Sequence, residues 1–353
     1  MLRPSVRCWL PALPGHWFSP LFSPNMPLSD KLSPSRGSLG ALPARFRRPR
    51  LLVVGCGDVG LRAVQALLGT SAQPRLTVRA LTSSPGRVAE LRARRITPLL
   101  GDLDRPATLT RLAGLATHVL HLAPPPGTAG ATHDPRSAAL LRALRRSACA
   151  APGVVYASTS GVYGDAQGAW IDETRPTAPR TDRARRRVAA ESLVRRYGLD
   201  SGARSSVVRI PGIYAPDREG GTPRARLLRG TPVLCRADDV YTNHIHADDL
   251  ARALLSALWR GAPQRIYHAS DDTELLMGDY FDQAADLYGL PRPPRIGRAE
   301  ALQSLPAMQL SFMSESRRLR NTRLHKELRV KLRYPTTAQG LATEARPAAA
   351  TES

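Results

Sequence analysis

Short apolar runs alternate with helical patterns along most of the chain. The run from Arg50 to Val54 comes first, and it ends in a cluster of glycines. After the glycines, Val64, Leu67 and Leu68 recur at the spacing of one helix face. The pattern therefore predicts a strand, a glycine turn and a helix, in that order. Further strands are predicted at 76–81, 96–100, 117–122, 153–157, 206–210 and 264–268, and a helix at 87–94.

Strands separated by helical crossovers are typical of an α/β fold. They predict a Rossmann-type doubly wound parallel sheet with helices on both faces. The alternation fades from 218 to 240 and again beyond 276, which predicts a smaller C-terminal substrate lobe. We therefore expect a Rossmann domain over 49–217 and the lobe over 218–345, with a strand and a helix at about 241–270 that return to the core.

Residues 1–48 lack this pattern. They are rich in proline, serine and arginine, and Asp30 is their only acidic residue. This composition predicts a disordered N-terminal extension. The scarcity of acids also fits a transit peptide, but the prolines disfavour its amphipathic helix, and a true start at Met26 or a later codon is at least as good an explanation.

Composition favours a soluble, cytoplasmic protein. Hydrophobic residues make up 42% of the 353, enough for one sizeable core, and no apolar stretch reaches the roughly 18 residues of a membrane span. The cysteines form no Cys-x-x-Cys pair, which argues against a disulfide framework and a zinc site. They are Cys8, Cys56, Cys149 and Cys235.

The formal net charge of +22 raises the question of a nucleic-acid partner. Lys31, Lys326 and Lys331 are the only lysines, so 48 of the 51 basic residues are arginine, and they are scattered along the chain. The runs at 185–187 and 317–318 lack the interleaved aromatic residues that bind single strands. We interpret these runs as solvated helix faces and expect no specific nucleic-acid partner.

A glycine-rich loop, Gly55-Cys56-Gly57-Asp58-Val59-Gly60, directly follows the first strand and opens the first helix. That is the context of a dinucleotide-binding turn. The first glycine permits the tight turn, the second lets backbone N–H groups approach a pyrophosphate, and the third lets the helix pack closely on the strand. The loop predicts that NAD or NADP binds over Gly55, Gly57, Asp58, Val59 and Gly60.

The end of the second strand bears on the choice of cofactor. An NAD site usually carries Asp or Glu about 20 residues after the glycines, and no acid stands there. Thr82, Ser83, Ser84 and then Arg87 offer hydroxyls and a cation that suit a 2′-phosphate. We therefore prefer NADP over NAD, with Thr82, Ser83 and Arg87 as binding residues; ordinary turn residues are the alternative.

Together these segments resemble the NAD-dependent epimerase/dehydratase family, which are extended or atypical short-chain dehydrogenases/reductases. Besides the glycine loop, the resemblance rests on Gly101-Asp102-Leu103, His121-Leu122-Ala123, the segment 158–164, Arg209-Ile210-Pro211-Gly212-Ile213-Tyr214, the segment 243–250, and the tail from 333–336 to 340–341. It implies that Asp102 and Leu103 approach the adenine and that Leu122 and Ala123 lie beside the cofactor. It also implies a homodimer formed through two helices.

The resemblance further implies that Thr159, four residues before Tyr163, hydrogen-bonds the reacting oxygen. Closing a strand-end turn is the alternative role for this hydroxyl. The family's Tyr-x-x-x-Lys pair is missing, because alignment on a helix ending at Glu191 puts Arg183 and Arg187 in its two places. With a pKa above about 12, arginine does not exchange protons near neutral pH as tyrosine does.

Arg183 and Arg187 still suit a cofactor phosphate, a ribose or a developing alkoxide, and a solvated helix face is the plain alternative. Five other residues are candidates for proton transfer in cleft loops, with no choice among them. They are Tyr163, Tyr214, Asp165, Asp172 and Glu173.

His244, His246, Asp248 and Asp249 form a cluster that resembles a metal site, but no third protein ligand with suitable spacing is apparent. An N-cap from Asp248 or Asp249 explains the acids more simply, so no metal is expected.

Two functions follow from these features. The first is an NAD(P)-dependent oxidoreductase, epimerase or dehydratase that transfers a hydride to or from a carbonyl or carbinol carbon near Thr159. The second is a non-catalytic NAD(P)-binding sensor or scaffold, which the missing Tyr/Lys pair favours. The small-molecule substrate is not identified, although Arg218, Arg224 and Arg226 suit the diphosphate of a sugar nucleotide.

Overall fold

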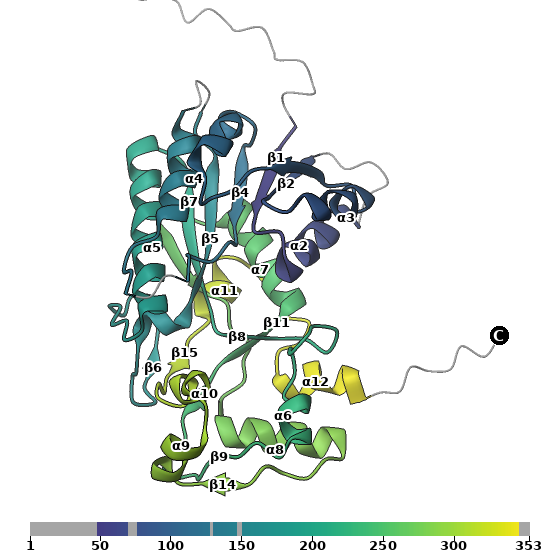
Figure 1. Cartoon of the computed structure of the whole chain (residues 1–353), viewed down its shortest axis with the longest axis vertical. Helices are drawn as coiled ribbons and strands as arrows, with labels where there is room; N and C mark the ends of the chain where they lie inside the picture. Colours follow the sequence, from purple (N-terminus) through teal and green to yellow (C-terminus); the bar gives the residue numbers. More distant parts are fainter. Residues whose placement is uncertain (1–47, 70–75, 128–129, 147–149, 346–353) are drawn as a thin grey trace, which may run out of the picture. The chain divides into compact units, whose positions relative to one another are not determined.

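The computed structural model describes residues 48–69, 76–127, 130–146 and 150–345 (Figure 1). Its centre is a seven-stranded sheet in the order β12-β7-β5-β4-β1-β2-β3, and every neighbouring pair is parallel. The strands are β1 (Arg50–Val54), β2 (Thr77–Thr82), β3 (Thr97–Leu100), β4 (His118–His121), β5 (Gly153–Thr159), β7 (Ser205–Ile210) and β12 (Arg265–His268). The predicted α/β Rossmann-type doubly wound sheet is confirmed, and each predicted strand is present to within two residues.

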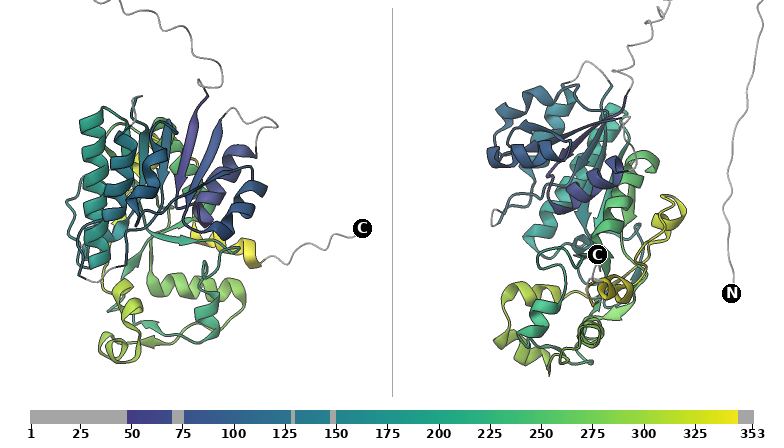
Figure 2. Two further views of the ribbon diagram at one scale, coloured as in Figure 1. Left: turned by 45° about the horizontal axis from the view of Figure 1, so that its top comes forward. Right: turned by 90° about the vertical axis from the view of Figure 1, so that its right-hand side faces the viewer.

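Helices cover both faces of this sheet (Figure 2). Leu51 and Val53 of β1 belong to a buried cluster with α2 and α7, whereas Leu52 and Val54 belong to one with α4 and α5. The alternation follows from the two-residue repeat of a strand, and the wholly apolar run of β1 reflects burial on both sides. The helices and turns that flank the sheet are α2 (Asp58–Leu68), η1 (Pro85–Arg87), α3 (Val88–Ala93), η2 (Pro106–Leu112), α4 (Pro135–Arg145), η3 (Ser160–Tyr163), α5 (Asp182–Ser201) and α7 (Ala247–Arg260).

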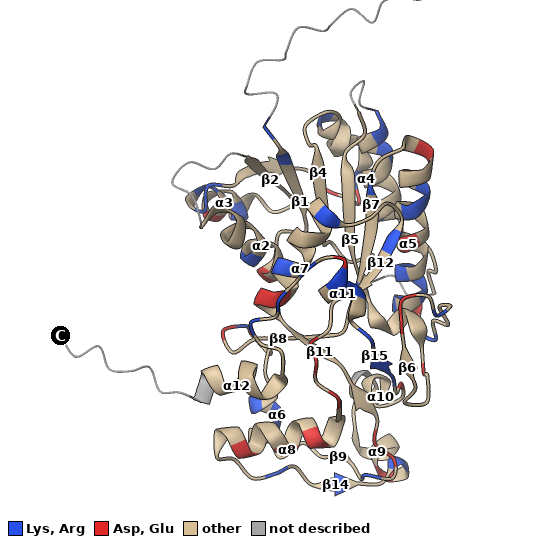
Figure 3. Cartoon of the chain, turned by 180° about the vertical axis from the view of Figure 1, so that it is seen from behind, with Lys and Arg blue, Asp and Glu red and all other residues tan. Residues whose placement is uncertain are grey.

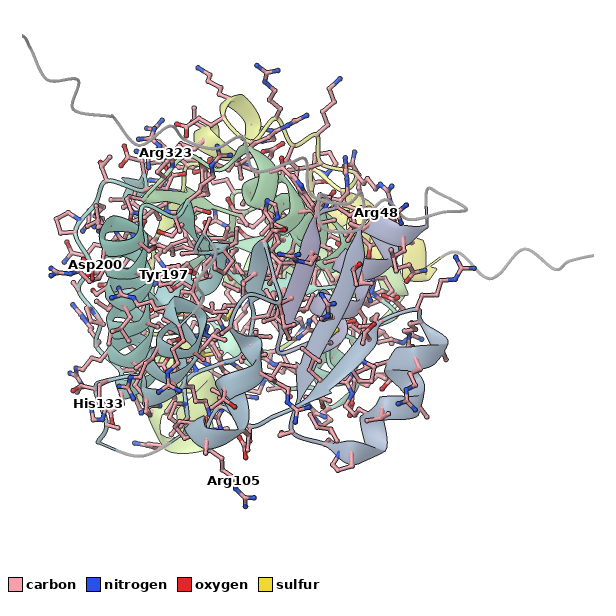
Figure 4. All side chains as sticks on the ribbon, turned by 90° about the horizontal axis from the view of Figure 1, so that it is seen from above. Arg48, Arg105, His133, Tyr197, Asp200 and Arg323 are labelled. Carbon is pink, nitrogen blue, oxygen red and sulfur yellow. The ribbon has the colours of Figure 1, made fainter. Side chains whose placement is uncertain are left out.

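Helix α5 is longer than the sequence indicated. The predicted end at Glu191 is wrong, because the helix runs on to Ser201 and stops at Gly202, whose φ of 66° suits glycine. Tyr197 turns toward the sheet and donates a hydrogen bond to the Pro152 carbonyl at 3.0 Å, whereas Asp200 points outward (Figure 4). The extra turns thus bury one more aromatic side chain.

Short elements lie at one end of the sheet, and several of them form a third apolar cluster, which includes Tyr214, Leu227, Val233, Tyr280 and Phe281. Ile171 and Leu319 belong to a fourth cluster. β8 pairs in parallel with β11, β9 with β14 and β6 with β15, while β10 pairs antiparallel with β13. These elements are β6 (Trp170–Ile171), β8 (Gly212–Tyr214), α6 (Arg224–Leu228), β9 (Val233–Leu234), β10 (Tyr241–Thr242), β11 (His244–His246), β13 (Leu275–Leu276), α8 (Met277–Tyr288), β14 (Arg295–Ile296), α9 (Arg298–Ser304), α10 (Ala307–Phe312), β15 (Arg318–Leu319) and α12 (Thr337–Ala345).

One stretch of the expected lobe packs elsewhere. α11 (Thr322–Lys326) contacts β12, and Leu324, Leu328 and Val330 are buried in the same cluster as α2 and α7. Residues from 322 to 332 therefore complete one face of the sheet rather than the lobe. The division at 217/218 stays a prediction.

Residues 1–47 lie outside the described part, so the disordered extension, the transit peptide and the alternative start stay predictions, and Cys8 and Cys149 also lie outside it. In the segments that are described, no helix is both long and apolar enough to cross a membrane. Arginine and lysine are spread over several helices and loops in Figure 3 rather than gathered on one element.

Candidate cofactor and substrate site

The three glycines of the loop after β1 differ in the space around them, and so in why a side chain is absent at each position. Gly55 has a φ of 83°, and a Cβ there would lie 2.5 Å from the backbone nitrogen of Ala123. A Cβ on Gly60 would lie 3.3 Å from side-chain atoms of Val53 and Leu122, so the third glycine lets α2 pack on the sheet. A Cβ on Gly57 would meet nothing within 4 Å. The protein itself needs the first and third glycines, and the space over the second is open to a ligand.

This open space belongs to a cavity of about 610 Å³, the glycine-loop cavity. It brings together twelve of the predicted cofactor residues from the ends of β1 to β4: Gly55, Gly57, Asp58, Val59, Gly60, Thr82, Ser83, Arg87, Asp102, Leu103, Leu122 and Ala123. The sequence missed Asp104 and Arg136, which also line it, and Ile213, which belongs to the segment 209–214 of the resemblance, lines it as well. A dinucleotide fits this donor set, since its pyrophosphate would meet the N-terminus of α2.

Arg87 braces the glycine loop. Its guanidinium donates to the Cys56 carbonyl at 2.7 Å and to Glu90 at 3.1 Å. Asp104 is held by a two-pronged contact from Arg136, and this hydrogen bond lowers the pKa of the Asp104 carboxyl. Burial raises the pKa of the Cys56 thiol to about 11, so the thiol stays protonated at neutral pH.

A second cavity of about 620 Å³ adjoins the first at Ile213 and Arg218, the two residues that line both. We call it the arginine cavity, because five arginines line it and Glu315 is the acid in its lining. The arginines come from segments far apart in the sequence: Arg183, Arg187, Arg218, Arg226 and Arg317. Such a lining suits an anionic ligand.

Thr159, the last residue of β5, lies in the arginine cavity. Its hydroxyl oxygen accepts the Gly161 N–H at 3.3 Å and so caps the turn η3. The hydroxyl proton is free to point at a ligand, since this capping bond uses only a lone pair. Turn closure and ligand contact are therefore compatible at this position.

Arg183 and Arg187 are set apart from the other predicted cofactor residues, because both line the arginine cavity. Arg187 donates to the Tyr156 hydroxyl at 3.1 Å and to the Ala157 carbonyl at 2.6 Å, which ties α5 to β5. Arg183 is exposed, and its guanidinium lies 5.6 Å from the centre of the Phe312 ring.

Of the five proton-transfer candidates, Tyr214 lines the arginine cavity, and the other four line neither cavity. Tyr163 is fully buried, and its hydroxyl lies 2.5 Å from the Nε2 atom of His268. Burial raises the pKa of Tyr163 to about 12. Glu173 accepts the His268 N–H at 3.1 Å, so it too supports the fold beneath the site.

Two polar groups that line the arginine cavity lack partners. Nδ1 of His244 is buried without a hydrogen bond among the described residues, and burial lowers the pKa of His244 to about 4. Nε and Nη2 of Arg226 are likewise buried and unpaired, while its guanidinium lies 4.4 Å from the centre of the Phe281 ring. The sequence singled out both residues but did not place them in one cavity.

The N-cap predicted for α7 is wrong. Nδ1 of His246 accepts the Asp248 N–H at 3.2 Å, so the histidine is the cap. Asp249 is buried and instead accepts the backbone N–H groups of Arg333 and Tyr334. Within the described segments, no group of His, Cys, Asp or Glu could hold a metal ion.

The interpretation of the two arginine runs as solvated helix faces is wrong in part, because Arg186, Arg317 and Arg318 make contacts within the protein. Arg186 is 7% exposed and donates to the Ala131 carbonyl at 3.1 Å. Arg317 donates to the Gly164 carbonyl and to Glu315, and Arg318 lies over the Tyr241 ring. Long arginine side chains can cover apolar surface with their stems while the guanidinium keeps its hydrogen bonds, as these do.

The model of the NAD dependent epimerase/dehydratase family matches residues 51–269. A functionally unknown conserved protein from Silicibacter pomeroyi is 30% identical, with a TM-score of 0.69 over 84% of this chain and 98% of its own. No curated protein matches the sequence.

Two further solved structures share the fold at lower identity. UDP-glucuronic acid 4-epimerase from Bacillus cereus, in complex with NAD, is 18% identical with a TM-score of 0.65, over 84% of this chain and 97% of its own. dTDP-glucose 4,6-dehydratase from Streptomyces venezuelae, with NAD bound, is 21% identical with a TM-score of 0.67, over 84% and 95%.

Proposed function

Because the chain belongs to the NAD dependent epimerase/dehydratase family, we propose that it is an NAD(P)-dependent oxidoreductase or epimerase acting in the cytoplasm, as a homodimer. The substrate carries a carbonyl or carbinol carbon that comes to lie near Thr159. When bound, the nicotinamide supplies or accepts the hydride. The protein holds the cofactor over the glycine loop and the substrate among the arginines.

One observation carries this proposal: the open space over Gly57 belongs to a cavity that adjoins a second cavity containing Thr159. A hydride donor and its acceptor must meet at close range, and two adjoining cavities provide that arrangement. In this proposal the Thr159 hydroxyl donates a hydrogen bond to the reacting oxygen. Arg187, tied to the end of β5 beside it, supplies a positive charge that favours a developing alkoxide.

The substrate is anionic in this proposal, and a sugar nucleotide is its preferred class. The lining of the cavity contains five arginines and one acid, Glu315. Two nitrogens of Arg226 are buried there without partners among the described residues. An unpaired buried guanidinium is costly, and a diphosphate would relieve that cost by charge-assisted hydrogen bonds. The bound UDP-glucose named for one solved neighbour is in keeping with this class.

We further propose NADP in preference to NAD, although the solved neighbours contain NAD. Ser83 is exposed just after β2, and both Ser83 and Arg87 line the glycine-loop cavity. The Arg87→Gln variant should lower the affinity for NADPH more than that for NADH, because only NADPH carries the 2′-phosphate. An unchanged NADPH/NADH ratio would remove this assignment.

The alternative is a non-catalytic NAD(P)-binding sensor or scaffold. The buried Tyr163, held by His268, and the arginines in place of the Tyr/Lys pair favour it. Turnover of NADPH with any substrate in a screen of carbonyl compounds and sugar nucleotides distinguishes the two, since a sensor binds the cofactor without consuming it.

The test of the cofactor site is titration of NADPH and NADH by nicotinamide fluorescence with the wild type and Gly57→Asp. Gly57 is the N-cap of α2, where Asp is favourable, so the variant should fold normally. Its carboxylate would occupy the place of the pyrophosphate, and binding should be lost. Gly127→Asp, at another exposed glycine with open space, is the matched control. Equal binding by all three proteins would refute the site.

A further inference from the structure

Arg218 is the charged residue that lines both cavities. It lies in a tight turn in which the N–H of Ala215 donates to the Gly221 carbonyl at 3.2 Å and that of Gly221 to the Arg218 carbonyl at 2.8 Å. A Cβ on Gly221 would collide with the Ala215 carbonyl. The turn therefore holds Arg218 at the boundary between the cavities.

The guanidinium of Arg218 is paired with the glycine loop. Its Nη1 atom lies 2.9 Å from Asp58, the first residue of α2. Asp58 is an unfavourable neighbour for a pyrophosphate, because two anions at one helix N-terminus repel each other. A cation on Asp58 is therefore needed where a dinucleotide is to bind.

A second ion pair anchors the same turn. Arg62 contacts Asp58 at 2.9 Å, Asp217 at 2.7 Å and Asp248 at 2.6 Å. Asp217 lies next to Arg218 and lines neither cavity. Three acids thus share Arg62, and Arg218 supplies the other cation of the group. Two neighbouring residues of the turn are therefore paired with α2: Asp217 with Arg62, and Arg218 with Asp58.

We propose that Arg218 is an anion-binding residue shared by the two ligands: it contacts the cofactor's pyrophosphate on one side and an anionic group of the substrate on the other. Asp58 and the Asp217–Arg62 pair position it. A guanidinium has five donors in a fixed fork, enough to reach two anions while keeping one contact to Asp58. This inference rests on the proposed function, because it requires both ligands.

The experiment compares arginines that line one cavity, both or neither. NADPH binding is measured by fluorescence and UDP binding by calorimetry, each with the other ligand absent. Arg218→Gln should weaken both ligands by about fivefold or more. Arg226→Gln should weaken UDP alone and Arg136→Gln NADPH alone. Arg224 was expected from the sequence to suit a diphosphate, but it is exposed, stacks on Tyr288 and lines neither cavity, so Arg224→Gln should weaken neither ligand.

Two more variants separate charge from mere structure. Arg218→Lys keeps the charge but lacks the planar fork of donors, so it should restore only part of both affinities. Asp217→Asn releases the turn without touching either lining, and it should weaken both ligands by a smaller factor than Arg218→Gln. If Arg218 served only as the partner of Asp58, lysine would restore both affinities in full, because a single ammonium is enough for that ion pair.

The outcomes are distinct. Loss of one affinity alone in Arg218→Gln would overturn the shared role, and so would binding of NADPH but not UDP by the wild type; both leave the cofactor site standing. Binding of neither NADPH nor NADH by the wild type would refute the proposed function, and the shared role with it.

Discussion

The glycine-loop cavity and the arginine cavity differ in what builds them. The first is lined mostly by residues at the ends of the four consecutive strands β1 to β4, so most of its lining lies between residues 54 and 124. The second gathers side chains from β5, α5, β8, β11 and the segment at 311–317. Backbone geometry is encoded locally, whereas side chains from distant segments meet only after the chain has folded. Substitutions should therefore affect the two cavities in different ways.

The largest expected effect is on the support of the arginine cavity. Glu191 and Arg209 form a buried two-pronged ion pair, with side chains 5% and 4% exposed, and Glu191 also accepts the hydroxyl of Ser158, next to Thr159. Glu191→Ala leaves Arg209 buried and unpaired, and should lower the free energy of unfolding by about 3 to 5 kcal/mol in urea titrations.

The matched control is Asp286→Ala. It removes an equally two-pronged pair with Arg292 whose side chains are 54% and 62% exposed. Exposed pairs contribute little, so a change of less than about 1 kcal/mol is expected. Equal losses in the two variants would contradict the account of Glu191.

The next effect concerns the backbone of the glycine loop. Gly55→Ala places a Cβ at a φ of 83° and against the Ala123 backbone, and it should lower the free energy of unfolding by about 3 kcal/mol. Gly57→Ala should leave that free energy within about 1 kcal/mol, since nothing lies within 4 Å of its Cβ. Chemical unfolding of both variants checks the pair, and similar losses would show that the loop tolerates no side chain anywhere.

A pH dependence marks the arginine cavity. Burial lowers the pKa of His244 to about 4, whereas the unfolded chain has a pKa of about 6.5. Between pH 4 and pH 6.5, His244 is therefore protonated in the unfolded chain but neutral in the folded protein. The stability that comes from keeping His244 neutral is fully present above pH 6.5. It is lost as the pH falls, by about 1.4 kcal/mol per pH unit.

His244→Phe keeps a ring to stack on Tyr280, whose ring centre lies 4.1 Å away, and removes the titration. Between pH 7 and pH 4, the free energy of unfolding of this variant should fall less steeply with pH than that of the wild type. The difference in slope should correspond to one proton. An unchanged slope would mean that His244 titrates normally in the folded protein.

The smallest expected effect on the free energy of unfolding is at Arg226, where stability and ligand binding should change in opposite directions. Arg226→Met replaces a half-buried, unpaired guanidinium by an apolar chain of similar length beside Phe281. We expect the free energy of unfolding to rise by about 1 kcal/mol while the affinity for UDP falls. A loss of stability would show that Arg226 serves the fold and not a ligand.

The sequence by itself determined the sheet and the loop over its first strand. The apolar run at the first strand predicts that both of its faces are buried. The spacing of Gly55, Gly57 and Gly60 after that strand predicts the role of each glycine in the turn. These features depend on neighbours within a few residues, so the pattern of one short segment carries them.

Only the tertiary structure decided the second cavity. It buried Tyr163 in a pair with His268 and brought Arg187 to the end of β5. It also set Arg218 between the two cavities. Contacts between residues about thirty to more than a hundred positions apart depend on how the lobe and the sheet pack, and spacing along the chain carries no record of that packing.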